Sequence, residues 1–423
     1  MKLKLSYLRV FQIAEVLEEI LKFKYPADSV LSNWFKNNKK LGHKDRGIVA
    51  SAVFDILRNL RKYRNYAQSG VGPENQRLAL LGLNSIYSAD EIKSMLKEDQ
   101  EQWFDRVLNI DESSLNDLVK YSVPEWLFNK VSQLQNFENL LNSLNQKAPL
   151  DIRANPLKAS REEILEIIKR DELLDDIDYS LTKYSPWGIR IKTNPSLNTW
   201  DIFKSGLIEV QDEGSQILCQ LVSPKRSDWV VDFCAGAGGK TLLLGALMHS
   251  HGRLYALDTA SNRLAKAKPR LARSGLSNVT CIPIKSENDE RVKRLFGKVD
   301  KVLVDAPCTG LGTLRRNPDL KWRQTPKDLQ ELIELQEKIL KAASRCVKKG
   351  GRLIYSTCSI LPQENQQQIE KFLSNNPEFK LINPEKVLGD RITGLESHKD
   401  MLILRPDVHG TDGFFAAVLE RVE

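Results

Sequence analysis

The spacing of hydrophobic residues predicts helices throughout the first third of the chain. Apolar side chains recur at helical spacing from residue 48 to residue 60, and earlier at Phe11, Ile13, Val16, Leu17, Ile20 and Leu21. This period matches one face of an α-helix, and no persuasive strand-like alternation interrupts it. We therefore predict an all-α N-terminal domain over residues 1–145.

The pattern changes at about residue 148. Short runs that alternate like strands are separated here by one helical stretch. The predicted strands are 150–156, 188–192 and 206–210, and the predicted helix is 160–168. We interpret residues 146–225 as a small α+β connecting subdomain.

Strand-like and helix-like segments alternate regularly from residue 226 to residue 423. The predicted strands are 229–233, 254–257, 279–283, 302–304, 353–356 and 414–419. The predicted helices are 241–248, 261–274, 326–346 and 363–373. This order is typical of an α/β fold with a doubly wound, largely parallel sheet, which binds ligands at the carboxyl ends of its strands.

Composition and charge narrow the possible partners. The 423 residues are 41% hydrophobic, and no apolar run approaches the roughly 20 residues needed to cross a bilayer. We expect a cytoplasmic protein with no membrane partner. The net charge of +8 modestly favours a polyanion, because Lys and Arg contacts release counterions from phosphates. The basic segment 44–64 is either a solvated helix face or a surface that follows phosphates.

Two cysteine motifs lie just after predicted strands. Cys308 is part of Asp305-Ala306-Pro307-Cys308, and Cys358 is part of Ser356-Thr357-Cys358-Ser359. Both therefore fall at the carboxyl edge of the predicted sheet, where a thiolate is suited to covalent catalysis. The six cysteines and five histidines show no metal-ligand spacing, so we expect free thiols and no metal.

A glycine-rich loop, residues 232–241, follows a strand and opens a helix, a position that favours a charged ligand group. It does not match a P-loop, because Cys234 stands where the first glycine is required. It does not match the dinucleotide pattern either, because Thr241 replaces the third glycine. Asp258 ends the next strand, where an acid can bind ribose hydroxyls. This combination favours S-adenosylmethionine (SAM) over an NTPase or dehydrogenase ligand, and the alternative is a tight turn alone.

Two thiols beside a SAM site suit methylation of a pyrimidine at carbon 5. That carbon becomes nucleophilic enough to accept a methyl group once a thiolate adds to carbon 6. One cysteine can be the nucleophile, and the other can assist breakdown of the adduct. Asp305 suits a contact to N3 or the exocyclic amino group, which favours cytosine. The residues alone leave the roles of the two cysteines open.

These motifs resemble the RsmB–Sun family of RNA cytosine-5 methyltransferases, and most of all its RsmB branch. The matching segments are 211–216, 232–241, 305–319, 356–365 and 412–415. The resemblance covers residues 148–423 and implies a class I, Rossmann-like SAM-dependent methyltransferase domain. The helical start resembles, more weakly, the NusB-type RNA-binding domain of the RsmB branch.

The resemblance also implies roles for the site residues. In that family the threonine-cysteine thiol is the nucleophile and the proline-cysteine thiol releases product, which carries over to Cys358 and Cys308, with Asp305 beside them. The implied cofactor contacts are Cys234, Ala235, Gly236, Ala237, Gly238, Gly239, Lys240, Asp258 and Asp305.

The implied substrate is RNA, and the RsmB-like layout points to small-subunit ribosomal RNA. The alternatives are a tRNA cytosine-5 methyltransferase of the same family and a non-catalytic RNA-binding assembly factor that keeps the fold. We expect a monomer. Whether the N-terminal domain sets specificity stays open.

The chain departs from the family pattern in its cofactor motifs. Its loop reads Ala235-Gly236-Ala237-Gly238-Gly239 instead of Ala-Ala-Pro-Gly-Gly, which keeps the backbone permissive. An acid near the adenine is common in the family, but Ser286 stands there, followed by Glu287 and Asn288. That contact is left open, as is the role of Lys240.

A charged segment after the proline-cysteine motif is a further candidate for contact with RNA. It combines basic side chains with one aromatic side chain, which suits contact with the RNA backbone and base stacking. Its residues are Arg315, Arg316, Lys321, Trp322 and Arg323. The alternative is a plain surface loop.

Overall fold

The computed structural model describes residues 5–171, 174, 177–193, 195–389, 395 and 400–422. It divides into two compact units. The first contains Met1–Lys147 together with Thr313–Pro326, and the second contains Ala148–Gly312 and Lys327–Glu423. The division into three segments at residues 145 and 225 stays a prediction.

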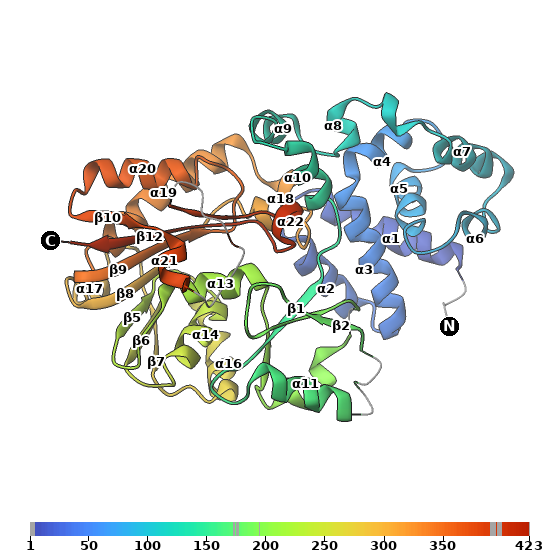
Figure 1. The fold of residues 1–423 in the computed structure, drawn as a ribbon. Helices are drawn as coiled ribbons and strands as arrows, with labels where there is room; N and C mark the ends of the chain where they lie inside the picture. The colour runs from blue at the N-terminus through green and yellow to red at the C-terminus, as the bar shows by residue number, and fades with distance from the viewer. Residues whose placement is uncertain are drawn as a thin grey trace. The chain divides into compact units, whose positions relative to one another are not determined.

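The first unit is helical, as its hydrophobic period predicts (Figure 1). Its helices are α1 (Tyr7–Ile20), α2 (Ala27–Asn37), α3 (His43–Arg58), α4 (Leu60–Tyr66), α5 (Glu74–Leu83), α6 (Ala89–Lys93), α7 (Glu98–Leu108), η1 (Glu112–Ser114), α8 (Asp117–Lys120), α9 (Glu125–Val131) and α10 (Phe137–Leu144). Helices α1, α3 and α5 pack together around a core that includes Ile13, Leu57 and Leu81. The periodic residue Phe11 is not part of the buried core, because it lies on the outer face of α1 and is 51% exposed.

Residues 313–326 fold with these helices and include α18 (Leu320–Arg323). The Lys321 ammonium donates to the Arg58 carbonyl at 2.7 Å and to Asn145 Oδ1 at 2.9 Å. The Trp322 indole donates to the Leu57 carbonyl at 2.7 Å, and its ring packs on the helical core. Lys321 is 1% exposed, and burial lowers its pKa well below the ordinary value. The expectation that Lys321 contacts RNA is therefore wrong, and the Trp322 ring supports this unit.

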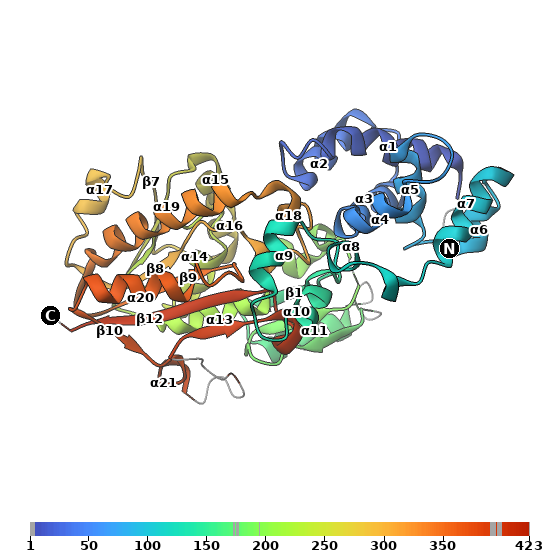
Figure 2. The ribbon, with the colours of Figure 1, turned by 90° about the horizontal axis from the view of Figure 1, so that it is seen from above.

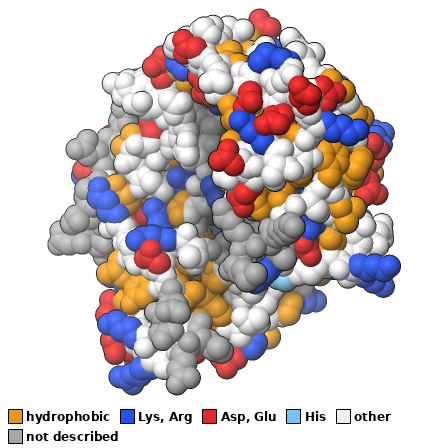
Figure 3. Space-filling model, turned by 90° about the vertical axis from the view of Figure 1, so that its right-hand side faces the viewer, with side chains coloured by type: hydrophobic (Ala, Val, Ile, Leu, Met, Phe, Trp, Pro, Cys, Tyr) orange, Lys and Arg blue, Asp and Glu red, His pale blue; other side chains and the backbone are white. Residues whose placement is uncertain are grey.

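The basic segment 44–64 does not form one free face. The Arg58 guanidinium is buried and donates to the Phe54 and Arg315 carbonyls. Arg61 donates to the Val123 carbonyl, and Lys62 pairs with Glu112 at 3.0 Å. On the face shown in Figure 3, Lys and Arg side chains are interspersed with acidic and hydrophobic ones. Much of this charge thus stabilises the helical unit itself.

The second unit contains a large twisted sheet with the strand order β10-β12-β9-β8-β5-β6-β7 (Figure 1), and β11 pairs with β12. Figure 2 shows this sheet from above, with β10 and β12 at one side and β7 at the other. Its strands are β5 (Trp229–Asp232), β6 (Arg253–Asp258), β7 (Val279–Pro283), β8 (Val299–Asp305), β9 (Val347–Thr357), β10 (Phe379–Ile382), β11 (Leu402–Leu404) and β12 (Phe414–Arg421). Strands β7, β6, β5, β8 and β9 run parallel, and β12 is antiparallel to β9. The predicted Rossmann-like, largely parallel sheet is confirmed.

Helices cover both faces of this sheet, because its strands are apolar on both sides. On one face, Val230, Leu303 and Ile354 pack against α13 (Glu213–Val222) and α14 (Gly239–Leu247). On the other face, Val231 and Tyr355 pack against α19 (Pro326–Ser344) and α20 (Gln366–Asn375). The helices of the unit are α11 (Arg161–Arg170), η2 (Leu197–Thr199), α12 (Asp201–Lys204), α13 (Glu213–Val222), α14 (Gly239–Leu247), α15 (Ser261–Ala265), α16 (Ala267–Ser274), α17 (Glu290–Lys293), η3 (Leu311–Thr313), α19 (Pro326–Ser344), α20 (Gln366–Asn375), α21 (Pro384–Leu388) and α22 (Pro406–His409).

A second, smaller sheet lies in the region 148–210. Its strands are β1 (Leu150–Ala154), β2 (Tyr179–Leu181), β3 (Gly188–Ile191) and β4 (Ile208–Val210), in the antiparallel order β2-β3-β1-β4. Three of these strands match the predicted ones, and the short edge strand β2 was not predicted.

The predicted helix 261–274 is instead two helices, α15 and α16. Pro269 explains the break, because it has no N–H to donate to the Ala265 carbonyl and its ring crowds that position. Among the described residues, none of the helices combines the length and hydrophobicity that crossing a bilayer requires.

Candidate active site

The candidate residues gather where neighbouring parallel strands end. Asp232 ends β5, Asp258 ends β6 and Asp305 ends β8. The register pairs Asp305 with Ser356 of β9, so the loops that follow these two strands leave the sheet side by side. Strand β5 lies between β6 and β8, so the order of the strands reverses at β5. Open α/β sheets bind ligands at such a point.

The two motif cysteines are in contact. Their Sγ atoms lie 3.3 Å apart, and both are free thiols that are partly buried. The hydrogen bond with Cys358, followed by burial, raises the pKa of Cys308 well above its ordinary value. Cys308 is therefore held as a thiol near neutral pH.

The glycine-rich loop takes a conformation that requires glycine. Gly236 and Gly238 have φ values of +55° and +80°, and a Cβ on Gly238 would lie 2.9 Å from the Ala267 side chain. The Gly236 N–H donates to Asp258 Oδ2 at 2.7 Å, and the Ala260 N–H donates to Oδ1 at 2.7 Å. Asp258 thus holds the loop, and each of its oxygens keeps a second lone pair for a ligand hydroxyl.

Asp232 has one carboxylate oxygen without a partner. Oδ2 accepts from the Thr241 hydroxyl at 2.7 Å, whereas the buried Oδ1 has no hydrogen bond. Burial raises the pKa of Asp232 to about 7. An orphaned acceptor of this kind suits a ligand ammonium.

Lys240 lies beside Asp305, and their Nζ and Oδ2 atoms are 2.6 Å apart. Burial alone would lower the pKa of Lys240, but the Asp305 carboxylate overrides it and raises that pKa. The Lys240 ammonium also lies 5.8 Å from the centre of the Phe414 ring. Lys240 therefore holds the Asp305 carboxylate in place.

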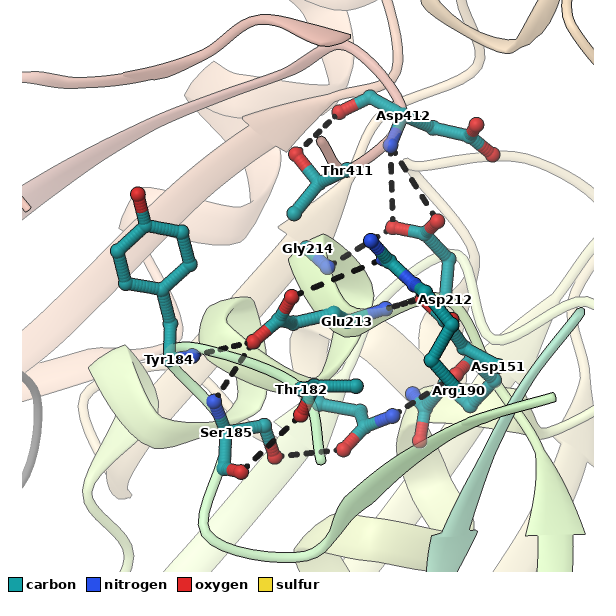
Figure 4. A network of polar contacts seen from close by, with 12 residues as sticks. Asp151, Thr182, Tyr184, Ser185, Arg190, Asp212, Glu213, Gly214, Thr411 and Asp412 are labelled. Carbon is teal, nitrogen blue, oxygen red and sulfur yellow. Dashed lines mark hydrogen bonds and ion pairs between the residues drawn. The ribbon is translucent and has the colours of Figure 1, made fainter. Parts of the chain in front are cut away.

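A network of polar contacts links the small sheet to the motif at 211–216 and to the turn at Thr411 and Asp412 (Figure 4). Arg190 forms a two-pronged ion pair with Asp151, and the Tyr184 and Ser185 N–H groups donate to Glu213. Asp212 accepts from the Asp412 N–H at 3.3 Å. The motif at 211–216 therefore serves to join these elements.

The Asp412 turn continues this chain of contacts to the thiol pair. The N–H of the next residue, Gly413, donates to the Gly312 carbonyl at 2.8 Å, and the Gly312 N–H donates to the Cys358 carbonyl at 2.9 Å. A Cβ on Gly312 would lie 2.1 Å from the Gly413 carbonyl oxygen. Only glycine therefore fits where these loops meet.

The residues near the expected adenine contact interact mainly with each other. The Asn288 N–H donates to Ser286 Oγ at 3.2 Å, and the Asn288 amide donates to Glu287 at 2.7 Å. Which of them meets the adenine stays open. A nearby candidate that the sequence analysis missed is Arg263, whose guanidinium would lie 2.8 Å from a Cβ on Gly236. It lies five residues after Asp258, at the start of α15, and this closeness to the strand end is the signal that could have found it.

Cys234, Cys219 and Cys346 are free thiols. Cys234 lies in the loop with a pKa that burial raises well above its ordinary value, so it stays a thiol. Cys219 and Cys346 are buried. In the described part of the chain, no group of three His, Cys, Asp or Glu residues could hold a metal ion.

Comparison with known proteins places these features in a family. The model of the 16S rRNA methyltransferase RsmB/F family matches residues 219–420, and that of the ferredoxin-like domain of RsmF/B-like methyltransferases matches residues 123–198. A probable ribosomal RNA small subunit methyltransferase B of Synechocystis is 35% identical over 354 residues, which are 81% of this chain and 75% of the relative. The chain belongs to the RsmB/F methyltransferase family.

Other comparisons agree with this membership of the RsmB/F family. A ribosomal RNA small subunit methyltransferase B of Photorhabdus laumondii is 31% identical, covering 78% of this chain and 74% of the relative. The solved structure of PH0851 is 28% identical, with a TM-score of 0.78 over 99% of this chain and all of that one. A methyltransferase homologue from Pyrococcus horikoshii is 28% identical, with a TM-score of 0.61 over 74% of this chain and all of that one.

Members of this family are SAM-dependent methyltransferases. The residues of the site fit that cofactor, because the loop offers open backbone at Gly239 and an unpartnered carboxylate oxygen at Asp232. Asp258 supplies acceptors for hydroxyl groups next to them.

Proposed function

We propose that this RsmB/F family member methylates carbon 5 of cytosine in small-subunit ribosomal RNA, through a covalent bond between Cys358 and carbon 6 of the base. The observation that carries this proposal is the pair of thiols 3.3 Å apart beside the SAM loop. A methyltransferase that acts on a nitrogen or oxygen atom does not require a nucleophilic thiol, whereas carbon 5 of a pyrimidine does.

The proposed reaction needs one thiolate and one thiol. The Cys358 thiolate adds to carbon 6, and the electron pair that this releases makes carbon 5 nucleophilic. SAM, when bound, supplies the methyl group on a positively charged sulfur. After carbon 5 takes the methyl group, it loses its proton to a base, and the Cys358–carbon 6 bond breaks to restore the aromatic ring.

The charged groups around the two cysteines support the assignment of Cys358 as the nucleophile and of Cys308 as the residue that assists release. The positive charge of Lys240 interacts with Cys358. The negative charge of Glu364 acts on Cys308 and contributes to its raised pKa. Cys308 therefore keeps a proton with which it can assist release of the product, and the role of nucleophile falls to Cys358.

Asp305 supports the choice of base. Its carboxylate ends β8, pairs with Lys240 at 2.6 Å and also accepts from the Ser356 hydroxyl at 3.2 Å. An acceptor held in this way suits the exocyclic amino group of cytosine and repels the carbonyl that uracil has at the same position.

The substrate class rests on the relatives. Two relatives more than 30% identical to this chain are named as ribosomal RNA small subunit methyltransferases. The net charge of +8 supports binding to a polyanion, although it does not distinguish ribosomal RNA from tRNA. The cytoplasmic location and the monomeric state stay predictions.

The test is transfer of a labelled methyl group from SAM to small-subunit ribosomal RNA that lacks modification, followed by bisulfite sequencing. We expect one protected cytosine with the wild type and none with Cys358→Ala. Transfer to tRNA alone would reassign the substrate. Absence of transfer to any RNA would favour the non-catalytic assembly factor.

A further inference from the structure

A buried glutamate, Glu364, lies between the loops that carry the two cysteines. Glu364 is 0% exposed and lies six positions after Cys358 in the chain. Its Oε1 accepts from the Thr309 backbone N–H at 2.8 Å, and its Oε2 accepts from the Thr309 hydroxyl at 2.6 Å. Its Oε2 also accepts from the Ser359 hydroxyl.

These donors stand immediately after the cysteines in the chain. Thr309 follows Cys308, and Ser359 follows Cys358. One carboxylate thus holds the residue next to each thiol. The Thr309 and Ser359 hydroxyl oxygens are themselves 3.3 Å apart, which matches the 3.3 Å between the two sulfur atoms.

Helix α19 contributes a third support to the same carboxylate. Gln336, which is 0% exposed, donates to Glu364 Oε1 at 3.0 Å and to the Pro307 carbonyl at 2.9 Å. The Tyr355 hydroxyl donates to the Glu364 carbonyl at 2.7 Å, which ties the glutamate to strand β9. Hydrogen bonds to an ionised acceptor are stronger than neutral ones, and their loss in a buried site is costly.

We propose that Glu364 is a positioning residue that sets the separation of the Cys308 and Cys358 thiols. This inference rests on the proposed function for its catalytic meaning, but the geometry that it explains exists without RNA. The Glu364 carboxylate accepts its hydrogen bonds from Thr309, Ser359 and Gln336. It acts through Thr309 and Ser359, so that the thiol that releases product stays within reach of the thiol that forms the adduct.

A trivalent arsenical tests this separation directly. Phenylarsine oxide condenses with two thiols to form two As–S bonds and one water molecule, with no oxidant, and it requires two adjacent sulfur atoms. Wild-type protein should bind it tightly through Cys308 and Cys358, as mapped by mass spectrometry of the two peptides. Cys358→Ala provides the reference for a single thiol.

Glu364→Gln keeps the size of the side chain but removes the charge. We expect about fivefold weaker binding of phenylarsine oxide, the effect of losing about one hydrogen bond in a buried cluster. The matched control is Glu370→Gln, because Glu370 is exposed on α20 just after this loop. The affinity of this control variant for phenylarsine oxide should equal that of the wild type. If Glu364→Gln does not fold, Thr309→Val removes one hydroxyl from the same cluster and should weaken binding in the same direction.

A second measurement separates this inference from the proposed function. With RNA and SAM, Glu364→Gln should slow release of the covalent adduct more than its formation. Equal arsenical affinity in wild type, Glu364→Gln and Thr309→Val would overturn the positioning role. Weaker affinity in the variants, together with no adduct in any protein, would keep the positioning role and reject the proposed reaction.

Discussion

Lys240 connects the cofactor loop to the reacting groups through its charge. Its ammonium pairs with Asp305 at 2.6 Å and interacts electrostatically with Cys358. A side chain at the start of α14 therefore influences both the recognition of the base and the reactivity of the thiol. A lysine at the start of a helix would otherwise be unfavourable for the helix dipole, which indicates that its position serves the site.

Replacement of Lys240 by glutamine should make Cys358 less reactive. The variant loses the Coulomb attraction between the Lys240 ammonium and a negative charge on the Cys358 sulfur. We expect alkylation of Cys358 by iodoacetamide at pH 7.5 to be several-fold slower in the variant than in the wild type. Mass spectrometry of the peptide measures the rate, and Lys338→Gln on an exposed part of α19 is the control. An unchanged rate would show that Lys240 does not act on the thiol.

Asp232 should make the stability of the cofactor-free protein depend on pH. Its pKa in the fold is about 7, against an ordinary value of 3.8, because burial disfavours the charge. Between these values the folded state binds a proton that the unfolded state has lost, so stability falls as pH rises from about 4 to about 7. The slope is about 1.4 kcal/mol per pH unit for one proton.

Asp232→Asn removes this contribution. Melting curves of wild type and variant at several pH values should converge near pH 4, and the variant should gain stability relative to the wild type towards pH 7. A difference between the two proteins that does not vary with pH would contradict the raised pKa.

At the scale of elements, residues 313–326 show the clearest difference between expectation and structure. Their charges and aromatic ring suggest a surface for RNA, but α18 folds with the helical unit. No local pattern predicts this, because Lys321 and Trp322 each donate to a backbone carbonyl about 260 positions earlier in the chain. Contacts between residues so far apart in the chain become visible only in the folded structure.

Trp322→Ala tests whether this segment supports the helical unit. We expect a loss of about 2 kcal/mol, from a partly buried indole and one hydrogen bond, and a fall of several degrees in Tm. Binding of RNA at 20 °C should stay within about twofold of wild type. Lys327→Ala is the control, since that side chain is 85% exposed. An unchanged Tm with weakened RNA binding would restore the role in base stacking.

The parallel strands were predictable from sequence, whereas the short antiparallel strands β10 and β11 were not. Strands β5, β8 and β9 are buried on both faces, so they appear as continuous apolar runs that end in the chemical motifs. Strands β10 and β11 are short and pair at one side of the sheet, where the apolar signal is weak. The division of the 261–274 helix required attention to a single proline, Pro269.

At the scale of the whole molecule, the site was predictable in its members but not in its support. The motifs place Asp258, Asp305 and the two cysteines at strand ends, and the structure brings them to one edge of the sheet. Glu364 lies in the motif segment 356–365, but the groups that donate hydrogen bonds to it belong to Thr309 and Gln336. No sequence spacing connects these two residues to Glu364. Conversely, most of the basic residues in 44–64 contact protein groups instead of forming a face.

The net charge of +8 should make binding to RNA depend on salt. Four phosphate contacts on single-stranded RNA would raise the Kd about 50-fold between 50 and 200 mM salt. Fluorescence anisotropy with a fragment of small-subunit ribosomal RNA measures this change. A change below about threefold would show that phosphate contacts do not drive binding.

The covalent intermediate offers the most direct test of the proposed function. Cys308→Ala, incubated with SAM and unmodified small-subunit ribosomal RNA, should accumulate an RNA–protein adduct that survives a denaturing gel, because the thiol that assists release is gone. Cys358→Ala should give no adduct. An adduct with Cys358→Ala and none with Cys308→Ala would contradict the assignment of Cys358 as the nucleophile.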